Sequence, residues 1–173
     1  GEAFDDAGDG DPGTIQWDDS AFQINISGTV YADDGVTTMG APTCDGATTN
    51  VRVQVDGGTY TDAVSCDGSG NFNFSNVAYN GDANIVVYLD TDGGEHGTVV
   101  TRTPTGDITD MDIYANRVIV RHENTATLSI ADMTQFDNAD DADIRFTAST
   151  STSPDTLNVL PGAGLYVWDT KEF

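Results

Sequence analysis

The sequence predicts an all-β fold, an antiparallel β-sandwich with one short helix. Two observations carry this prediction. The chain of 173 residues is rich in Asp, Gly, Thr, Asn and Val and poor in helix formers, a composition typical of strands joined by tight turns. Apolar and polar residues also alternate in about ten short stretches at regular intervals, as in sandwiches and barrels. The length favours one domain, which we place at residues 14–173, behind a flexible acidic leader at residues 1–13.

The strands are predicted from this alternation, in chain order. The first begins at Thr14 and bends at residues 18–20. Val51, Val53 and Val55 alternate in the next, and Gly57 and Gly58 after them indicate a hairpin with a two-residue turn. Further strands are predicted at residues 72–77, 85–89, 97–102, 111–114, 117–122, 144–148, 157–160 and 165–168.

One segment, residues 129–137, has the pattern of a helix. Ser129 is a suitable N-cap, and Ile130, Met133 and Phe136 fall on one helical face. We expect this helix to close one open end of the sandwich.

Several of these segments resemble known families. ISGTVYADDG (26–35), NVRVQV (50–55) and CDGSGNFNFSNV (66–77) resemble the carboxypeptidase-regulatory-like or transthyretin-like β-sandwich, an Ig-like fold, with one additional residue before Phe72. Residues 86–133, followed near the end by LYVWDTKEF, are similar to a repeat unit of large bacterial cell-surface proteins. The resemblance implies an extracellular structural or adhesive module without catalysis, and it assigns no functional residues.

The charge balance restricts the partners. A formal net charge of −23 excludes the basic face that nucleic acids and anionic membranes require. No apolar run approaches the roughly 20 residues of a membrane span. Cationic partners and metal ions remain, and 25 aspartates beside a single lysine suit saline or calcium-containing surroundings. The resemblance to cell-surface repeat units implies a secreted protein at the cell surface, and the first residue, Gly1, is compatible with a processed chain.

Cys44 and Cys66 are predicted to form a disulfide. If Gly57 and Gly58 form the hairpin turn, residue 66 lies opposite residue 49, and a short loop brings Cys44 to it. The bond would close a loop of about 20 residues and contribute about 3 kcal/mol. The alternative is two unrelated free thiols.

Calcium is the one cofactor that the sequence suggests. Asp90, Asp92 and Glu95 supply oxygen ligands at short spacing around glycines, as do the acids of the leader, Asp6, Asp9 and Asp11. The alternative is that both clusters are solvated turns. We find no nucleophile, zinc or phosphate-binding motif and expect no enzyme activity.

Two N-x-S sequons, at Asn25 and Asn73, mark either glycosylation sites or chance matches within strands.

Two features suggest self-assembly. Residues 14–26 form a candidate donor strand that could complete the sheet of a neighbouring subunit and bury Ile15, Trp17, Phe22 and Ile24; alternatively they are the first strand of their own domain. Arg117 and Arg121 would stand on one strand face, about 7 Å apart. They pair with acids either within one subunit or between two.

The leading functional hypothesis is therefore a subunit of a cell-surface filament or surface layer, a polymer of this chain. The alternative is an adhesin-type module that binds carbohydrate or a calcium-dependent surface, with a stacking platform formed by Trp17, Tyr60, Tyr88, Tyr166 and Trp168.

Overall fold

The computed structural model describes residues 22–40, 44–58, 63–102, 104–121, 123 and 127–167. Its elements, in chain order, are β1 (Phe22–Tyr31), β2 (Thr49–Val55), β3 (Ala63–Val64), β4 (Asn71–Tyr79), β5 (Asn84–Thr91), β6 (Thr98–Arg102), β7 (Ile113–Tyr114), β8 (Arg117–Val120), α1 (Ile130–Met133), β9 (Phe146–Ser149), β10 (Thr156–Val159) and β11 (Gly164–Val167). The all-β, sandwich-like fold with one short helix is confirmed.

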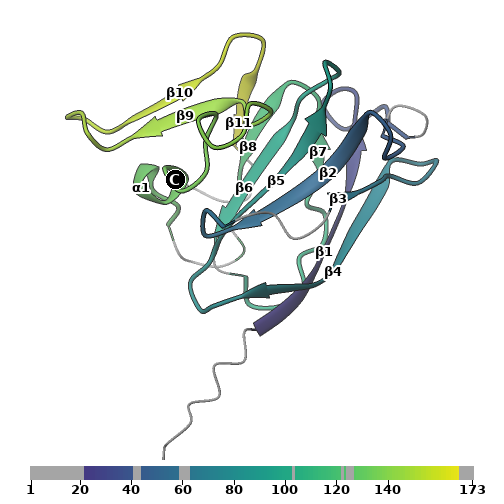
Figure 1. Ribbon diagram of the computed structural model, residues 1–173, viewed down its shortest axis with the longest axis horizontal. Coiled ribbons are helices and arrows are strands. Elements are labelled where there is room, and N and C mark those ends of the chain that lie inside the picture. The colour runs from purple at the N-terminus through teal and green to yellow at the C-terminus, as the bar shows by residue number, and fades with distance from the viewer. Residues whose placement is uncertain are drawn as a thin grey trace, which may run out of the picture.

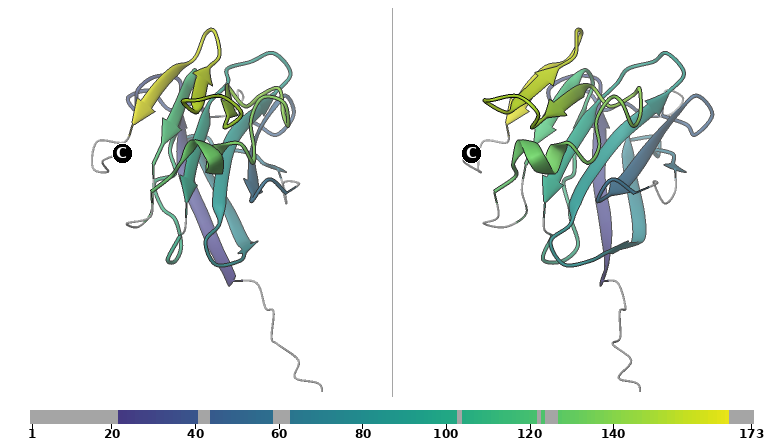
Figure 2. Two further views of the ribbon diagram at one scale, coloured as in Figure 1. Left: turned by 90° about the vertical axis from the view of Figure 1, so that its left-hand side faces the viewer. Right: turned by 60° about the vertical axis from the view of Figure 1, so that its left-hand side comes forward.

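The strands form one large sheet and two small ones (Figure 1). The large sheet has six strands in the order β11-β8-β6-β5-β2-β3, the second has the order β4-β1-β7, and β9 and β10 form a hairpin. Figure 2 shows the large sheet in the middle, with β1 and β4 on one side and α1, β9 and β10 on the other. The described part of the chain thus has three layers rather than the two of a simple sandwich.

Each face of the large sheet buries its own hydrophobic core. Alternate residues of β5 divide between them: Ile85, Val87 and Leu89 face the core shared with β1 and β4, whereas Val86 and Tyr88 face the core shared with α1, β9 and β10. A strand buried on both faces is apolar at every position. This explains the run IVVYL, in which all five side chains are fully buried.

The sequence predicts antiparallel pairing throughout, but three of the described strand pairs are parallel: β1 with β7, β6 with β8, and β8 with β11. For β6 and β8 the reason is the path between them, and β8 and β11 are likewise joined by a long connection, through α1, β9 and β10. Part of the connection from β6 to β8 runs beside β1, where Ile26 pairs with Ile108, before the chain returns to the large sheet. A long connection of this kind can return a strand parallel to its neighbour, which a tight hairpin cannot do.

The β2–β3 hairpin has the predicted register, because Val51 lies opposite Val64. Its turn begins one residue earlier than predicted: Asp56 and Gly57 both have positive φ, and Gly58 N donates to Val55 O at 2.9 Å. Two successive positive φ values allow a tight turn, in which Asp-Gly is a favoured pair. This turn alone would place Val51 opposite residue 62, so it does not by itself set the observed register.

The helix begins where predicted but is shorter, and it packs at a different place in the fold. Ser129 is the N-cap, and Asp132 completes a capping box, but α1 ends at Met133. Met133 and Phe136 pack into the second core, on the face of the large sheet. The prediction that the helix closes an open end of the sandwich is therefore wrong. The described residues contain no helix long and apolar enough to cross a membrane.

Candidate functional site

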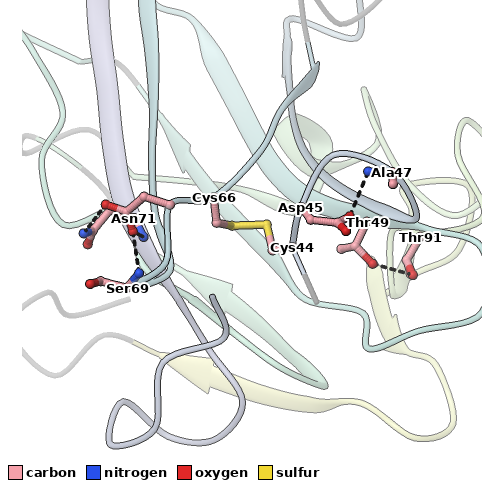
Figure 3. Close-up of a disulfide and its surroundings, with 9 residues drawn as sticks. Cys44, Asp45, Ala47, Thr49, Cys66, Ser69, Asn71 and Thr91 are labelled. Atoms are coloured by element: carbon pink, nitrogen blue, oxygen red, sulfur yellow. Dashed lines mark hydrogen bonds between the residues drawn. A yellow bond between two sulfur atoms is a disulfide. The ribbon is translucent and has the colours of Figure 1, made fainter. Parts of the chain in front are cut away.

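The predicted disulfide is present. Cys44 and Cys66 are bonded, with their Cα atoms 5.3 Å apart, and both side chains are buried (Figure 3). The N–H of Cys66 also donates to the carbonyl of Cys44 at 2.8 Å. The bond ties the loop before β2 to the residues after β3, so that it closes the base of the hairpin.

The two arginines singled out in the sequence, Arg117 and Arg121, form ion pairs with acids of their own subunit. Arg117 forms an ion pair with Asp34 at 3.0 Å, and Arg121 forms one with Glu123 at 2.8 Å. The guanidinium of Arg121 also donates to the backbone carbonyls of Thr109 and Asp110. The two arginines differ in exposure: the side chain of Arg117 is 36% exposed and that of Arg121 is 12% exposed. Arg117 is therefore the one with access to a further partner.

The three acids predicted as a calcium site are not brought together. Asp90 is paired with Arg52 across β2 and β5, and the carboxylate of Glu95 accepts a hydrogen bond from Asn116. Asp92 lies exposed in the turn after β5. Within the described ranges, no group of three or more His, Cys, Asp or Glu side chains could hold a metal ion. The other predicted cluster, Asp6, Asp9 and Asp11, lies outside the described residues.

Many aspartates instead stabilise turns. We use the name capping aspartates for Asp33, Asp67 and Asp107, whose carboxylates each accept two or more hydrogen bonds. Those of Asp33 and Asp67 accept from residues two to four positions on, and that of Asp107 accepts from the backbone and side chain of Asn25 on β1. The Thr37 N–H is the main cause of the lowered pKa of Asp33. The side chain of Asn71 has the same effect on the pKa of Asp67, and the Asn25 N–H on that of Asp107. At Asp33 and Asp67 the short side chain suits this role, because it reaches the backbone two to four residues away.

A polar network lies between the large sheet and the third layer. The hydroxyl of Tyr88, a fully buried side chain, donates to Asp141 at 2.8 Å and accepts from the amide of Gln54 at 3.2 Å. Nearby, Asp143 lies 3.0 Å from the Nδ1 atom of His96. Burial raises the pKa of the Asp143 carboxyl, and the pKa of the Tyr88 hydroxyl rises for the same reason. The network anchors residues 141–143 to the sheet.

The positions of Tyr88 and Tyr166 argue against the predicted aromatic platform for carbohydrate stacking. Tyr88 is enclosed in the second core, and the ring of Tyr166 packs edge-on against Tyr114, with the ring centres 5.7 Å apart. Trp17, Tyr60 and Trp168 lie outside the described residues. The two aromatic side chains that can be placed thus serve packing, because a stacking platform needs an exposed ring face.

The candidate donor segment is only partly described. Ile15 and Trp17 lie outside the described residues, whereas residues 22–26 belong to β1, which pairs with β4. Ile24 is buried in the core of its own domain, opposite Val77, and Phe22 is 64% exposed at the start of the strand. For residues 22–26 the alternative, the first strand of the domain, is therefore correct, and Ile24 cannot also insert into a neighbour.

The sequon asparagines are both placed. The side chain of Asn25 is engaged, because its amide donates to Asp107 at 3.0 Å and its carbonyl accepts from Asn76 N at 3.3 Å. Asn73 is exposed on β4, and its amide donates to Ser75 at 3.0 Å.

Sequence reasoning missed the exposed apolar pair on β11. Leu165 and Val167 are 49% and 38% exposed, and β11 is the last strand at its end of the large sheet. A signal was present in the sequence, because alternate apolar residues in LYVW predict a half-buried strand. Its position at a sheet edge depends on strand order, which the alternation does not reveal.

Comparison of the chain with protein-family models, with curated proteins and with solved structures gives no match.

Proposed function

We propose that the protein is an extracellular structural subunit that polymerises with copies of itself through β-sheet contacts, as in a cell-surface filament or surface layer. The observation that carries the proposal is the outer edge of β11, which has no strand partner within the described part of the chain. Two large apolar side chains stand there, on the surface of a strongly acidic protein. An unpaired strand edge offers main-chain donors and acceptors to another chain, and exposed apolar side chains favour its docking.

Three other features support this proposal. The disulfide is compatible with an oxidising, extracellular environment. The two cores and the cross-linked hairpin stabilise the subunit against unfolding. Four of the five arginines form ion pairs with acids of the same chain, so they are already engaged within the subunit. The protein as a whole keeps a net charge of −23. Subunits with this charge repel one another at low salt, so assembly through an apolar edge should be favoured by salt.

The test compares the full chain with a chain lacking residues 1–20, which keeps all of β1. Both are examined by sedimentation velocity and electron microscopy at about 0.15 M and about 1 M NaCl, where the Debye length falls from about 8 Å to about 3 Å. We expect the full chain to form oligomers or fibres at high salt and the shortened chain to stay monomeric. Addition of calcium in a parallel series shows whether the ion contributes. A full chain that stays monomeric in every condition would refute the proposal.

A further inference from the structure

The inference concerns which strand edge receives a neighbouring subunit, and it rests on the proposed function. Most described edges are unsuited to strand addition. β3 and β7 have two residues each, and β4 is interrupted where Ser75 and Asn76 lie opposite Asn25. The edge of β9 is occupied, because Asn138 N donates to Phe146 O at 2.8 Å. Short or bulged edges resist pairing with another chain.

β11 has the required main-chain geometry. The N–H of Gly164 donates to the carbonyl of Asn116 at 2.9 Å, toward β8. Because hydrogen-bonding direction alternates along a strand, the main-chain groups of Leu165 and Val167 point the other way, to the outer edge. The side chains of these same residues are the exposed ones, and they lie on the face that carries Val118 and Val120. A strand added here would gain both hydrogen bonds and apolar contacts.

The segment TIQWD, residues 14–18, has the complementary pattern. Ile15 and Trp17 are two residues apart, so on a strand they share one face, with Gln16 and Asp18 on the other. We infer that residues 14–18 of a second copy add to the outer edge of β11 in the antiparallel direction, with Ile15 opposite Val167 and Trp17 opposite Leu165.

Charge fixes the direction. In this register Asp18 lies opposite Gly164, which in turn pairs with Arg117 of β8. Gly164 has no side chain, and a Cβ at this position would lie 3.6 Å from Nη1 of Arg117, so the guanidinium lies over the glycine, near the edge. A guanidinium carries five N–H donors, so Arg117 can hold Asp34 and also donate to the carboxylate of Asp18. The parallel direction would move Asp18 away from this charge.

The experiment uses the full chain with Trp168→Phe, which leaves Trp17 as the only tryptophan. Sedimentation velocity measures assembly, and the tryptophan emission maximum measures burial of Trp17. As the concentration rises at about 1 M NaCl, both should change together. Leu165→Pro removes an outward N–H and should abolish both changes while the thermal unfolding midpoint is kept. Asn73→Ala, at an exposed side chain on β4 in the other sheet, is the control and should change neither.

A matched pair tests the register. Asp18→Asn and Asp19→Asn remove the same charge from adjacent positions, but only Asp18 faces Arg117. We expect Asp18→Asn to weaken assembly about two- to fivefold relative to Asp19→Asn, as for an exposed ion pair. Equal effects would overturn the antiparallel register.

The remaining outcomes separate the inference from the proposed function. If Leu165→Pro assembles like its parent, or if assembly leaves the Trp17 emission unchanged, the inference is wrong while polymerisation stands. If the parent does not assemble, both fail. Should Leu165→Pro prove unfolded, Leu165→Lys decides in its place, because a charge on the edge blocks strand addition without altering the bonds to β8.

Discussion

Removal of the disulfide should cost the protein about 3 kcal/mol of stability. Cys44 and Cys66 are 22 residues apart, and a cross-link over such a loop restricts the unfolded chain by about that free energy. The loop contains all of β2 and β3, one end of the six-stranded sheet. For a chain of this length the loss corresponds to a fall of about 6–12 °C in the unfolding midpoint.

The assay is urea unfolding followed by circular dichroism, with three samples. These are the oxidised protein, the same protein after reduction, and the variant Cys44→Ala/Cys66→Ala. Reduction removes only the cross-link, whereas the variant also removes two buried sulfur atoms. The difference between the last two samples therefore measures packing alone. Reducing agent should not alter the variant, which serves as the control.

The reasoning would be refuted if the reduced protein lost less than about 0.5 kcal/mol, since the loop-entropy account predicts about six times that amount. A loss confined to the alanine variant would assign the effect to the buried sulfur atoms instead.

Three further predictions follow from the polar contacts. Tyr88→Phe should destabilise the fold by about 1–3 kcal/mol in urea unfolding, because the buried Gln54 and the partly buried Asp141 each lose a hydrogen bond; no loss would mean that the network is dispensable. Arg121→Gln should cost about 1–3 kcal/mol and Arg117→Gln less than about 1 kcal/mol, since only the former is largely enclosed; equal losses would contradict the difference in exposure. The free energy of unfolding should pass through a maximum at mildly acidic pH. The capping aspartates, with pKa values below the ordinary 3.8, stabilise the fold above that pH and lose their contribution as the pH falls through their lowered pKa values. The partly buried carboxyls of Asp112 and Asp143, with raised pKa values, favour the fold at lower pH and lose that contribution as the pH rises through their pKa values. A stability that rises steadily from pH 4 to 8 would contradict this assignment.

Local pattern was enough to predict most strands. The alternation of β2 and β4 and the two glycines at positions 57 and 58 are local properties, and the register of the hairpin was predicted from them. The disulfide could be predicted for the same reason, because it depends on that register. Strand order could not, since the parallel pairing of β6, β8 and β11 depends on a connection that crosses to the other sheet.

The second core left a signal that alternation alone does not interpret. The run IVVYL in β5 is apolar at every position, which favours a strand covered on both faces over one with a solvent side. The candidate calcium site failed for a different physical reason. Aspartates around glycine fit both calcium loops and self-capped turns, and only the positions of the carboxylates separate the two.

The arrangement of two cores on one sheet also determines which part of the fold can unfold first. The layer formed by α1, β9 and β10 contacts the sheet through its own hydrophobic cluster, with Phe136 and Phe146 at its centre. Such a layer can detach as a cooperative unit while the hydrogen-bonded sheet beneath it stays intact. Amide protons of residues 130–149 should then exchange sooner than those of β5. Partial opening would uncover Val86, Tyr88 and Val100, so the outer layer also protects the central strands from aggregation.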